Sequence, residues 1–316
     1  MSTTDTSPVW KRVAWGLALV TVIFVGDRVM AAGLNAAMMG TGNRYAVIYR
    51  GEAPGGVLLL GNSRGVNTFH QPTIEEAIDR PVFNASFNGT STQFAEVILR
   101  DYVERNPTPR LVVLEVTGLA AGVNQLQNFF PFGSESARLD AYLNEAVSPT
   151  VATARRLFHL YNYNGEMLFR SLAAAGATDQ GEINRYTISP GLIASTRRET
   201  PEPLRSNPEN LAALQEIVAF CEANDIELRL VIGPYLPIYR ERIPAYDEWV
   251  ASVREAAGGM RVWDYSLAID DETAFADRVH MNYRGARQLT PILVADGLFD
   301  LDSAAPADTT LTEPTP

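Results

Sequence analysis

Two short runs of consecutive apolar residues constrain the fold most strongly. VLLLG at Val57–Gly61 and LVVLEV at Leu111–Val116 are typical of strands that are buried on both faces of a parallel sheet. Segments with helical spacing of apolar residues alternate with the predicted strands, as in a parallel sheet covered by helices on both faces. Three further strands are predicted at Pro81–Ala85, Glu227–Gly233 and Arg261–Tyr265, and helices at Thr92–Glu104, Leu211–Ala223 and Tyr283–Val294.

The N-terminal segment is apolar enough to interact with a membrane. Val13–Gly26 carries no charge, follows the basic pair Lys11-Arg12, and is followed by Asp27-Arg28 and a second mainly apolar stretch, Val29–Gly40. A basic flank before the apolar run favours a cytoplasmic N-terminus and an exported remainder. We therefore interpret residues 1–40 as a membrane anchor or signal segment, with the anchor preferred. The rest of the chain is predicted to be extracytoplasmic, which means periplasmic in a Gram-negative cell.

The remaining chain divides into one α/β domain, an insertion and a tail. Residues 41–301 form the predicted domain, and the strand–helix rhythm breaks between about 128 and 208, where aromatic clusters such as Phe129-Phe130 occur. This mostly helical insertion either shapes a substrate site or serves as a scaffold or docking surface. Residues 302–316 are small, polar and rich in proline, so we expect a disordered tail.

Composition excludes several classes of protein. The chain has 26 Lys and Arg against 37 Asp and Glu, a net charge of −11, which disfavours nucleic acid as a partner. The single cysteine, Cys221, excludes an internal disulfide and a zinc site built on several thiolates, and is interpreted as a buried apolar residue. No dinucleotide fingerprint, P-loop or histidine–carboxylate metal cluster is present, so neither a cofactor nor a metal is predicted.

Ser63 and His280 are the candidate reacting residues. Ser63 follows the first buried strand, at the edge of the sheet where a helix begins, and is either a nucleophile or a helix N-cap. Asp277 precedes His280 by three residues, a spacing that places a carboxylate against the imidazole and orients it as a base. The other two histidines, His70 and His159, are better explained as packing or surface residues.

Taken together, these motifs resemble those of the SGNH (GDSL-like) hydrolase superfamily. Gly61-Asn62-Ser63-Arg64 is similar to its first block, Asn84–Thr90 to its second, and Asp277 with His280 to its last. The resemblance implies a flavodoxin-like three-layer sandwich with a five-stranded parallel sheet, and an oxyanion hole made by the N–H groups of Ser63 and Gly89. The third block departs from the family, because Thr117-Gly118 follows the third strand without an asparagine, and the nearest, Asn124, is several residues away.

Polar and aromatic residues beside these blocks are further candidates. They lie next to the predicted triad or at the carboxyl end of a strand, where open α/β sheets bind ligands. The candidates for substrate contact are Asn62, Arg64, Asn88, Thr117 and Tyr235. For Tyr235, which lies in a proline-rich turn, a structural role is the alternative.

The anchor, the altered third block and the insertion resemble a membrane-anchored subgroup of this superfamily, which assists acyl modification of cell-surface polymers. The resemblance implies a serine esterase or O-acyltransferase acting on acyl, foremost acetyl, groups of a cell-surface glycan, beside a membrane-bound acyltransferase. Two alternatives remain open. One is an inactive accessory protein that binds a glycan or the acyltransferase, and the other is a lipid esterase.

Overall fold

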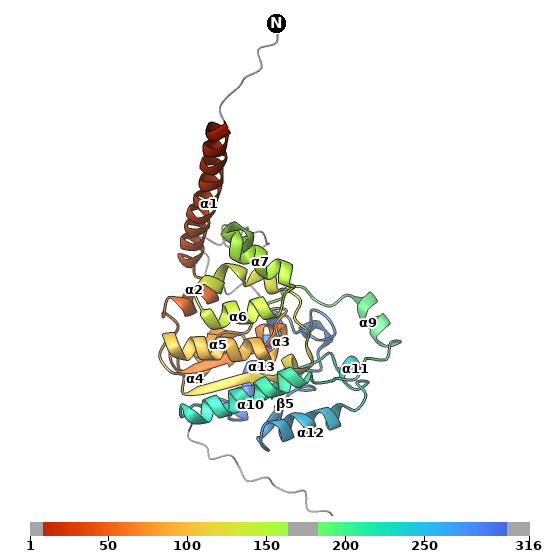
Figure 1. Ribbon diagram of the computed structural model, residues 1–316. Coiled ribbons are helices and arrows are strands. Elements are labelled where there is room, and N and C mark those ends of the chain that lie inside the picture. The colour runs from red at the N-terminus through yellow and green to blue at the C-terminus, as the bar shows by residue number, and fades with distance from the viewer. Residues whose placement is uncertain (1–8, 164–182, 302–316) are drawn as a thin grey trace, which may run out of the picture. The chain divides into compact units, whose positions relative to one another are not determined.

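The computed structural model describes residues 9–163 and 183–301. Contacts divide the chain into two compact units (Figure 1). The first contains residues up to Glu52 and from Gln125 to Asp179, and the second contains the remaining residues, Ala53–Asn124 and Gln180 onward. The predicted tail, 302–316, and part of the predicted insertion, 164–182, lie outside the described residues.

The second unit is built on a five-stranded parallel sheet with the order β2-β1-β3-β4-β5. This is the doubly wound order of flavodoxin-like folds. All five strands fall where the sequence predicts them, and their buried runs explain why both faces need a helical cover. The strands are β1 (Val57–Leu60), β2 (Val82–Asn84), β3 (Leu111–Glu115), β4 (Glu227–Ile232) and β5 (Val262–Asp264).

Helices cover the two faces of the sheet in two groups. Helix α4 (Gln71–Ile78) packs on α13 (Tyr283–Ala295), whereas α5 (Thr92–Arg105) packs on α10 (Pro208–Ala223), which also contacts α12 (Tyr246–Ala256). This grouping is what right-handed crossovers produce when the chain winds outward in both directions from β1. The shorter helices of this unit are α3 (Ser63–Thr68), η1 (Val116–Ala120), α9 (Pro190–Thr196), α11 (Pro237–Arg240) and η5 (Glu272–Ala274).

Because side chains alternate along each strand, the core has one part under each of these two groups of helices. Val57 and Leu59 of β1 join a fully buried cluster with Ile74 of α4 and with Leu289 and Leu293 of α13. Successive strand residues point to opposite faces. The intervening residue, Leu58, which is also fully buried, therefore points toward the face covered by α5 and α10.

The first unit contains the long N-terminal helix. Helix α1 (Val9–Met39) is continuous over 31 residues, through Asp27-Arg28, and is long and apolar enough to cross a membrane. The sequence pattern divided this region into two apolar stretches, but nothing between them breaks a helix. The other elements of the unit are α2 (Arg44–Tyr49), η2 (Leu126–Asn128), η3 (Phe130–Ser134), α6 (Ala137–Glu145), α7 (Pro149–Leu157) and η4 (His159–Tyr163).

Aromatic residues of the predicted insertion form the core of this unit. Tyr45 of α2 stacks on Phe132 at 4.8 Å between ring centroids and meets Phe129 edge-on at 5.2 Å. Both phenylalanines are buried. Ring pairs at these spacings stabilise the fold by more than their buried area alone predicts, because the edge and the face of an aromatic ring carry opposite partial charges. These aromatic side chains are therefore packing residues of the unit.

A buried carboxylate ties α1 to the rest of this unit. Asp27 accepts hydrogen bonds from the backbone N–H groups of His159, at 2.8 Å, and Leu160, at 3.0 Å. These amides begin η4 and have no partner within it, so the carboxylate caps them and neutralises the positive end of the turn. The domain prediction treated residues 1–40 and the insertion as separate segments. The structure groups residues 9–52 with 125–163 and leaves 183–208 with the sheet.

A close approach of α3 to the chain after β2 explains a glycine in the nucleophile block. A Cβ atom on Gly65 would lie 2.4 Å from Ser86 Oγ and 2.9 Å from Ser86 Cβ. Ser86 is fully buried and has no room to move away. Only glycine therefore allows α3 to start directly above the sheet edge and hold Ser63 there.

We predict that Gly65→Ala lowers the free energy of unfolding by about 1–3 kcal/mol through overpacking. Urea unfolding of the detergent-solubilised chain, followed by tryptophan fluorescence, measures the change. Adding Ser86→Gly removes the colliding atoms and restores part of the loss. The matched control is Gly122→Ala, since a Cβ there meets nothing within 4 Å. Equal unfolding curves for the two alanine variants would contradict this account.

Candidate active site

Ser63 and His280 come from opposite ends of the sequence to the same edge of the sheet. Ser63 is the first residue of α3, directly after β1, and His280 lies in the loop after β5. Because all strands are parallel, their carboxyl ends and the loops that follow share one edge. That edge is where doubly wound proteins bind their ligands.

Hydrogen bonds join Ser63, His280 and Asp277 into one chain. His280 Nε2 lies 2.8 Å from Ser63 Oγ, and His280 Nδ1 lies 2.8 Å from Asp277 Oδ2. An ionised carboxylate only accepts, so the ring proton resides on Nδ1 and leaves Nε2 free to accept the serine proton. All three side chains are partly exposed, so a substrate can reach them.

Local bonds hold Asp277 in its ionised form. Burial alone raises the pKa of this carboxyl. The hydrogen bond and the charge of His280, together with the backbone N–H groups of Val279 and His280, outweigh burial and hold the pKa below its ordinary value. Asp277 Oδ1 accepts both backbone bonds at 2.8 Å. The carboxylate is therefore available to orient the imidazole and to stabilise an imidazolium across the neutral pH range.

Asn282 fixes the loop that carries this pair. Its Oδ1 accepts from the N–H groups of Arg284 and Gly285 and caps α13, while its Nδ2 donates to carbonyls in the turn before Asp277, including that of Thr273 at 2.9 Å. An antiparallel bridge between Phe275 and Met281 closes the turn. The N-cap preference of asparagine before a helical pattern was the available sequence signal for this residue.

A buried ion pair links the two halves of the site. Arg64 Nε lies 3.3 Å from Glu115 Oε1, and both side chains are almost fully buried, with exposed fractions of 6% and 0%. Arg64 also donates to the carbonyls of Val279 and Gly233, while Glu115 accepts from the Gly233 N–H at 3.4 Å. The pair thus joins the segments that follow β1, β3, β4 and β5. Sequence reasoning missed Glu115, because a single acidic residue at the end of an apolar strand carries no periodic signal.

Most of the predicted substrate-contacting residues are supports beneath this site. Asn62 caps α3 by accepting from the Arg64 N–H at 2.8 Å, and Thr117 Oγ1 donates to Glu115 at 2.6 Å. Tyr235 lies under Arg64, 3.5 Å from its guanidinium carbon, and burial raises the pKa of its phenol to about 12, so the ring stays neutral. These three side chains and Arg64 are buried, and Asn88 is partly exposed.

The predicted oxyanion donors lie in neighbouring loops. Gly89 follows β2, which pairs with β1, and the two loops stay joined beyond the strands by a bond from the Phe87 N–H to the Gly61 carbonyl at 3.1 Å. Gly89 has φ +70°, a left-handed conformation that favours glycine. Asn124, the nearest asparagine to the altered third block, donates its backbone N–H to the Gly89 carbonyl at 3.2 Å.

None of these contacts involves the other two histidines or Cys221. His70 is buried at the N-terminus of α4, where its Nδ1 accepts from the Thr73 N–H at 3.3 Å, and its ring meets Tyr283 edge-on. His159 belongs to the first unit. Burial raises the pKa of the Cys221 thiol to about 12, which keeps it in the unreactive thiol form.

The fold and the site together define a doubly wound α/β protein with a hydrogen-bonded Ser–His–Asp chain at the carboxyl edge of its sheet. Comparisons with known proteins do not refine this description further. No curated protein matches the sequence, and a protein-family model without a descriptive name matches residues 201–297, less than half of the chain. Among solved structures, a GDSL-like lipase from Bacteroides thetaiotaomicron is similar at 12% identity and a TM-score of 0.38, over 82% of this chain and 97% of that one. A likeness this distant carries no information about activity.

We predict that Glu115→Ala destabilises the chain by about 3–5 kcal/mol, because it leaves the buried Arg64 without its partner. The double variant Arg64→Met/Glu115→Leu removes both charges and regains much of the stability in urea unfolding. Its Ser63 nonetheless reacts more slowly with a fluorophosphonate, since the bond from Arg64 to the His280 loop is lost. A double variant with wild-type labelling would show that the pair does not position the loop.

Proposed function

We propose that this protein is a serine esterase or O-acyltransferase that acts on acyl groups of a cell-surface glycan. One observation carries the proposal: the 2.8 Å contacts that join Ser63, His280 and Asp277 into a chain able to move a proton. A serine hydroxyl needs such a base to attack a carbonyl at neutral pH.

The proposed reaction has two halves. Ser63 Oγ attacks the acyl carbonyl carbon while its proton passes to His280 Nε2, and the N–H groups of Ser63 and Gly89 stabilise the oxyanion. The tetrahedral intermediate collapses, the C–O bond to the leaving group breaks, and His280 returns the proton to the departing oxygen. Water or a glycan hydroxyl then attacks the acyl-serine by the same route, giving hydrolysis or transfer.

Two features support an extracytoplasmic glycan as the setting. Helix α1 is long and apolar enough to span a membrane, and the basic pair Lys11-Arg12 precedes its apolar section, as in anchors with a cytoplasmic N-terminus. The resemblance of the anchor, the altered third block and the insertion to the membrane-anchored SGNH subgroup supplies the substrate class and the proposed partner, a membrane-bound acyltransferase.

A second candidate function is a non-catalytic accessory protein of the same fold. It is favoured by the segment after β3, where Thr117 stands in place of an asparagine and its hydroxyl is already bonded to Glu115. Without a side-chain amide donor, a serine hydrolase loses about two to three orders of magnitude in rate. The accessory would use the same edge of the sheet to hold a glycan without turnover.

We predict that a fluorophosphonate and p-nitrophenyl acetate each add one group to the full chain, detected by intact-mass spectrometry. Ser63→Ala and His280→Ala abolish the adduct, and Asp277→Asn slows its formation by about 10⁴-fold, because the imidazole loses its orienting partner.

The matched control for these variants is Ser252→Ala, which removes a hydroxyl bonded to a carbonyl on α12. It labels at the wild-type rate. A well-folded wild type that forms no adduct with either reagent would reject the enzyme and favour the accessory protein. Preference for micellar over soluble esters would instead point to a lipid esterase.

Single-cysteine labelling tests the proposed topology. Cys221 is buried and its raised pKa keeps it unreactive, so an introduced cysteine reports alone. We predict that a membrane-impermeant maleimide labels Gly122→Cys in intact spheroplasts, because residue 122 is exposed and a Cβ there meets nothing. Ser2→Cys, before the helix, reacts only after lysis. The reverse pattern would place the sheet unit in the cytoplasm.

A further inference from the structure

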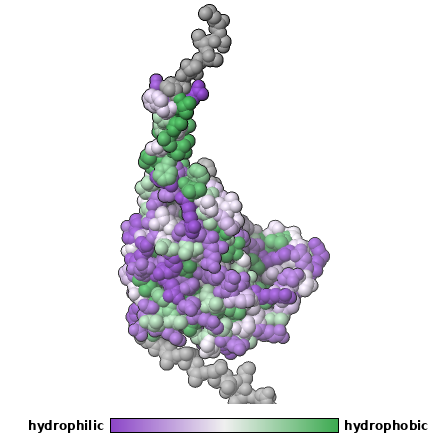
Figure 2. Space-filling view, viewed as in Figure 1, coloured by the Kyte–Doolittle hydropathy of each residue, from purple (hydrophilic) through white to green (hydrophobic). Residues whose placement is uncertain are grey.

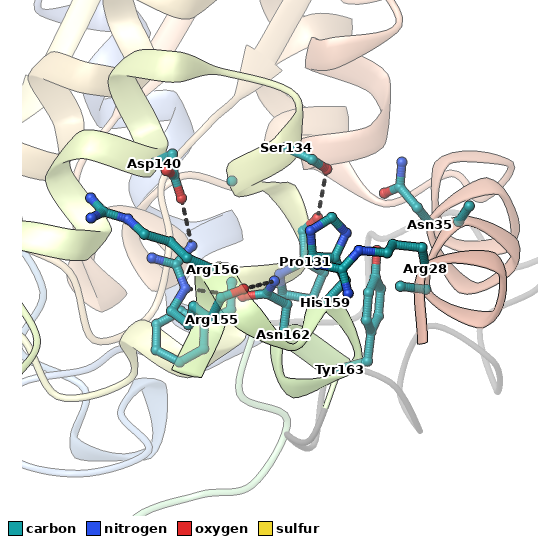
Figure 3. Close-up of a pocket in the computed structure, with 14 residues that line it drawn as sticks. Arg28, Asn35, Pro131, Ser134, Asp140, Arg155, Arg156, His159, Asn162 and Tyr163 are labelled. Carbon is teal, nitrogen blue, oxygen red and sulfur yellow. Dashed lines mark hydrogen bonds and ion pairs between the residues drawn. The ribbon is translucent and has the colours of Figure 1, made fainter. Parts of the chain in front are cut away.

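The first unit contains a pocket that the proposed reaction does not use. Its volume is 460 Å³, and it is lined by side chains of α1, η3, α6, α7 and η4 (Figure 3). All of its residues belong to the first unit, which does not contain Ser63 or His280.

The lining of this pocket is positively charged. Three arginines, Arg28, Arg155 and Arg156, line it against one acidic residue, Asp140, and Arg28 also pairs with Asp27 at 3.0 Å. This balance is opposite to that of the whole chain, whose net charge is −11. A local excess of arginine in an acidic protein favours an anionic ligand, because guanidinium groups pair well with phosphate and carboxylate.

The arginines of the pocket divide into fixed and available groups. Arg155 is bonded to Asp140 at 2.9 Å, Asn144 at 2.7 Å and Asn162 at 3.0 Å, so it forms a rigid wall. Arg156 is exposed and has no hydrogen-bond or ion-pair partner among residues 9–163 and 183–301. Burial lowers the pKa of Arg155, and the charge of Arg156 adds to this effect, whereas the bond to Asp140 opposes it.

The pocket begins where the exposed apolar section of α1 ends. The exposed large apolar side chains from Val13 to Val25, part of the green column of Figure 2, lie between two basic sites, Lys11-Arg12 and Arg28. Lys11 and Arg28 are separated by about 26 Å of helix. The hydrocarbon core of a bilayer is about 30 Å thick. Arg28 therefore lies at the boundary between hydrocarbon and headgroups. Its guanidinium pairs with Asp27 at 3.0 Å, donates from both terminal nitrogens to the Leu157 carbonyl at 3.3 Å, and lies over the Phe24 ring.

The turn that follows α7 has the composition of a membrane-surface segment. Leu157 and Phe158 are exposed at 57% and 54%, next to the bond from Arg28, and Arg156 and His159 flank them. Exposed apolar residues beside cations are typical of segments that insert at the interface and pair with anionic headgroups. No such cluster is needed for packing, because the core of this unit is formed by Tyr45 and the aromatic residues around it.

We propose that this pocket binds the phosphate headgroup of an anionic phospholipid, with Arg156, His159 and Arg28 as the contacting groups. The lipid chains lie along the apolar section of α1, and Leu157 and Phe158 enter the interface beside them. The inference rests on the proposed membrane anchoring but is independent of the proposed hydrolase chemistry.

The test uses the full chain in detergent and native mass spectrometry. The purified protein is titrated with phosphatidylglycerol, with phosphatidylcholine, and with glycerol phosphate as the free headgroup. Wild type retains phosphatidylglycerol in preference to phosphatidylcholine and does not retain glycerol phosphate, because the acyl chains contribute to binding. Arg156→Gln weakens phosphatidylglycerol binding by about fivefold, and Arg156→Gln/His159→Gln weakens it further.

The matched control is Arg254→Gln, which removes an exposed arginine from α12 of the other unit and retains wild-type lipid binding. Equal loss in Arg156→Gln and Arg254→Gln, no preference between the two lipids, or glycerol phosphate bound as tightly as the lipid would each overturn the proposal. Ser63→Ala binds phosphatidylglycerol as wild type does. Loss of Ser63 labelling and loss of lipid binding are therefore separate failures of separate proposals.

Discussion

The buried pair of Arg64 and Glu115 is the interaction on which the site depends. In a parallel sheet, the loops that follow the strands all lie at one edge, but the hydrogen bonds of the sheet do not determine how those loops are spaced. The guanidinium, bonded to Glu115 and to the carbonyls of Val279 and Gly233, fixes that spacing. Both charges are removed from water, so they are satisfied by each other, by nearby backbone groups and, for Glu115, by the Thr117 hydroxyl. Ser63 precedes Arg64 directly, and its distance from His280 follows from that bond.

A second buried charge has the corresponding role in the other unit. The carboxylate of Asp27 caps the amides of His159 and Leu160, which fixes the membrane-spanning candidate helix to the segment that completes the basic pocket. In both units, then, an ionic group satisfied by backbone groups links segments that are far apart in sequence. Such bonds give directional contacts that apolar packing alone does not provide.

The sequence predicted the sheet well, because its signals are local. Continuous apolar runs, turn residues and helical spacing lie within ten or fifteen residues of one another, and all five strands follow from them. The grouping of α1 with residues 125–163 did not follow, since it includes contacts of single polar side chains, such as that of Asp27 with the His159 amide and that of Arg28 with the Leu157 carbonyl. Neither contact leaves a periodic pattern in the chain.

For the site, the sequence by itself determined the candidate residues, Ser63, Asp277 and His280. A serine after a buried strand and an Asp-x-x-His turn near the end of the chain are recognisable, because nucleophile and base need particular residue types at particular spacings. Only the tertiary structure decided that 217 positions of separation become 2.8 Å, that Arg64 and Tyr235 are buried beneath the serine, and that cations gather where the apolar section of α1 ends. The physical reason is that residue identity fixes what a side chain can donate, accept or ionise, whereas distance, burial and local charge balance arise only when distant segments pack together.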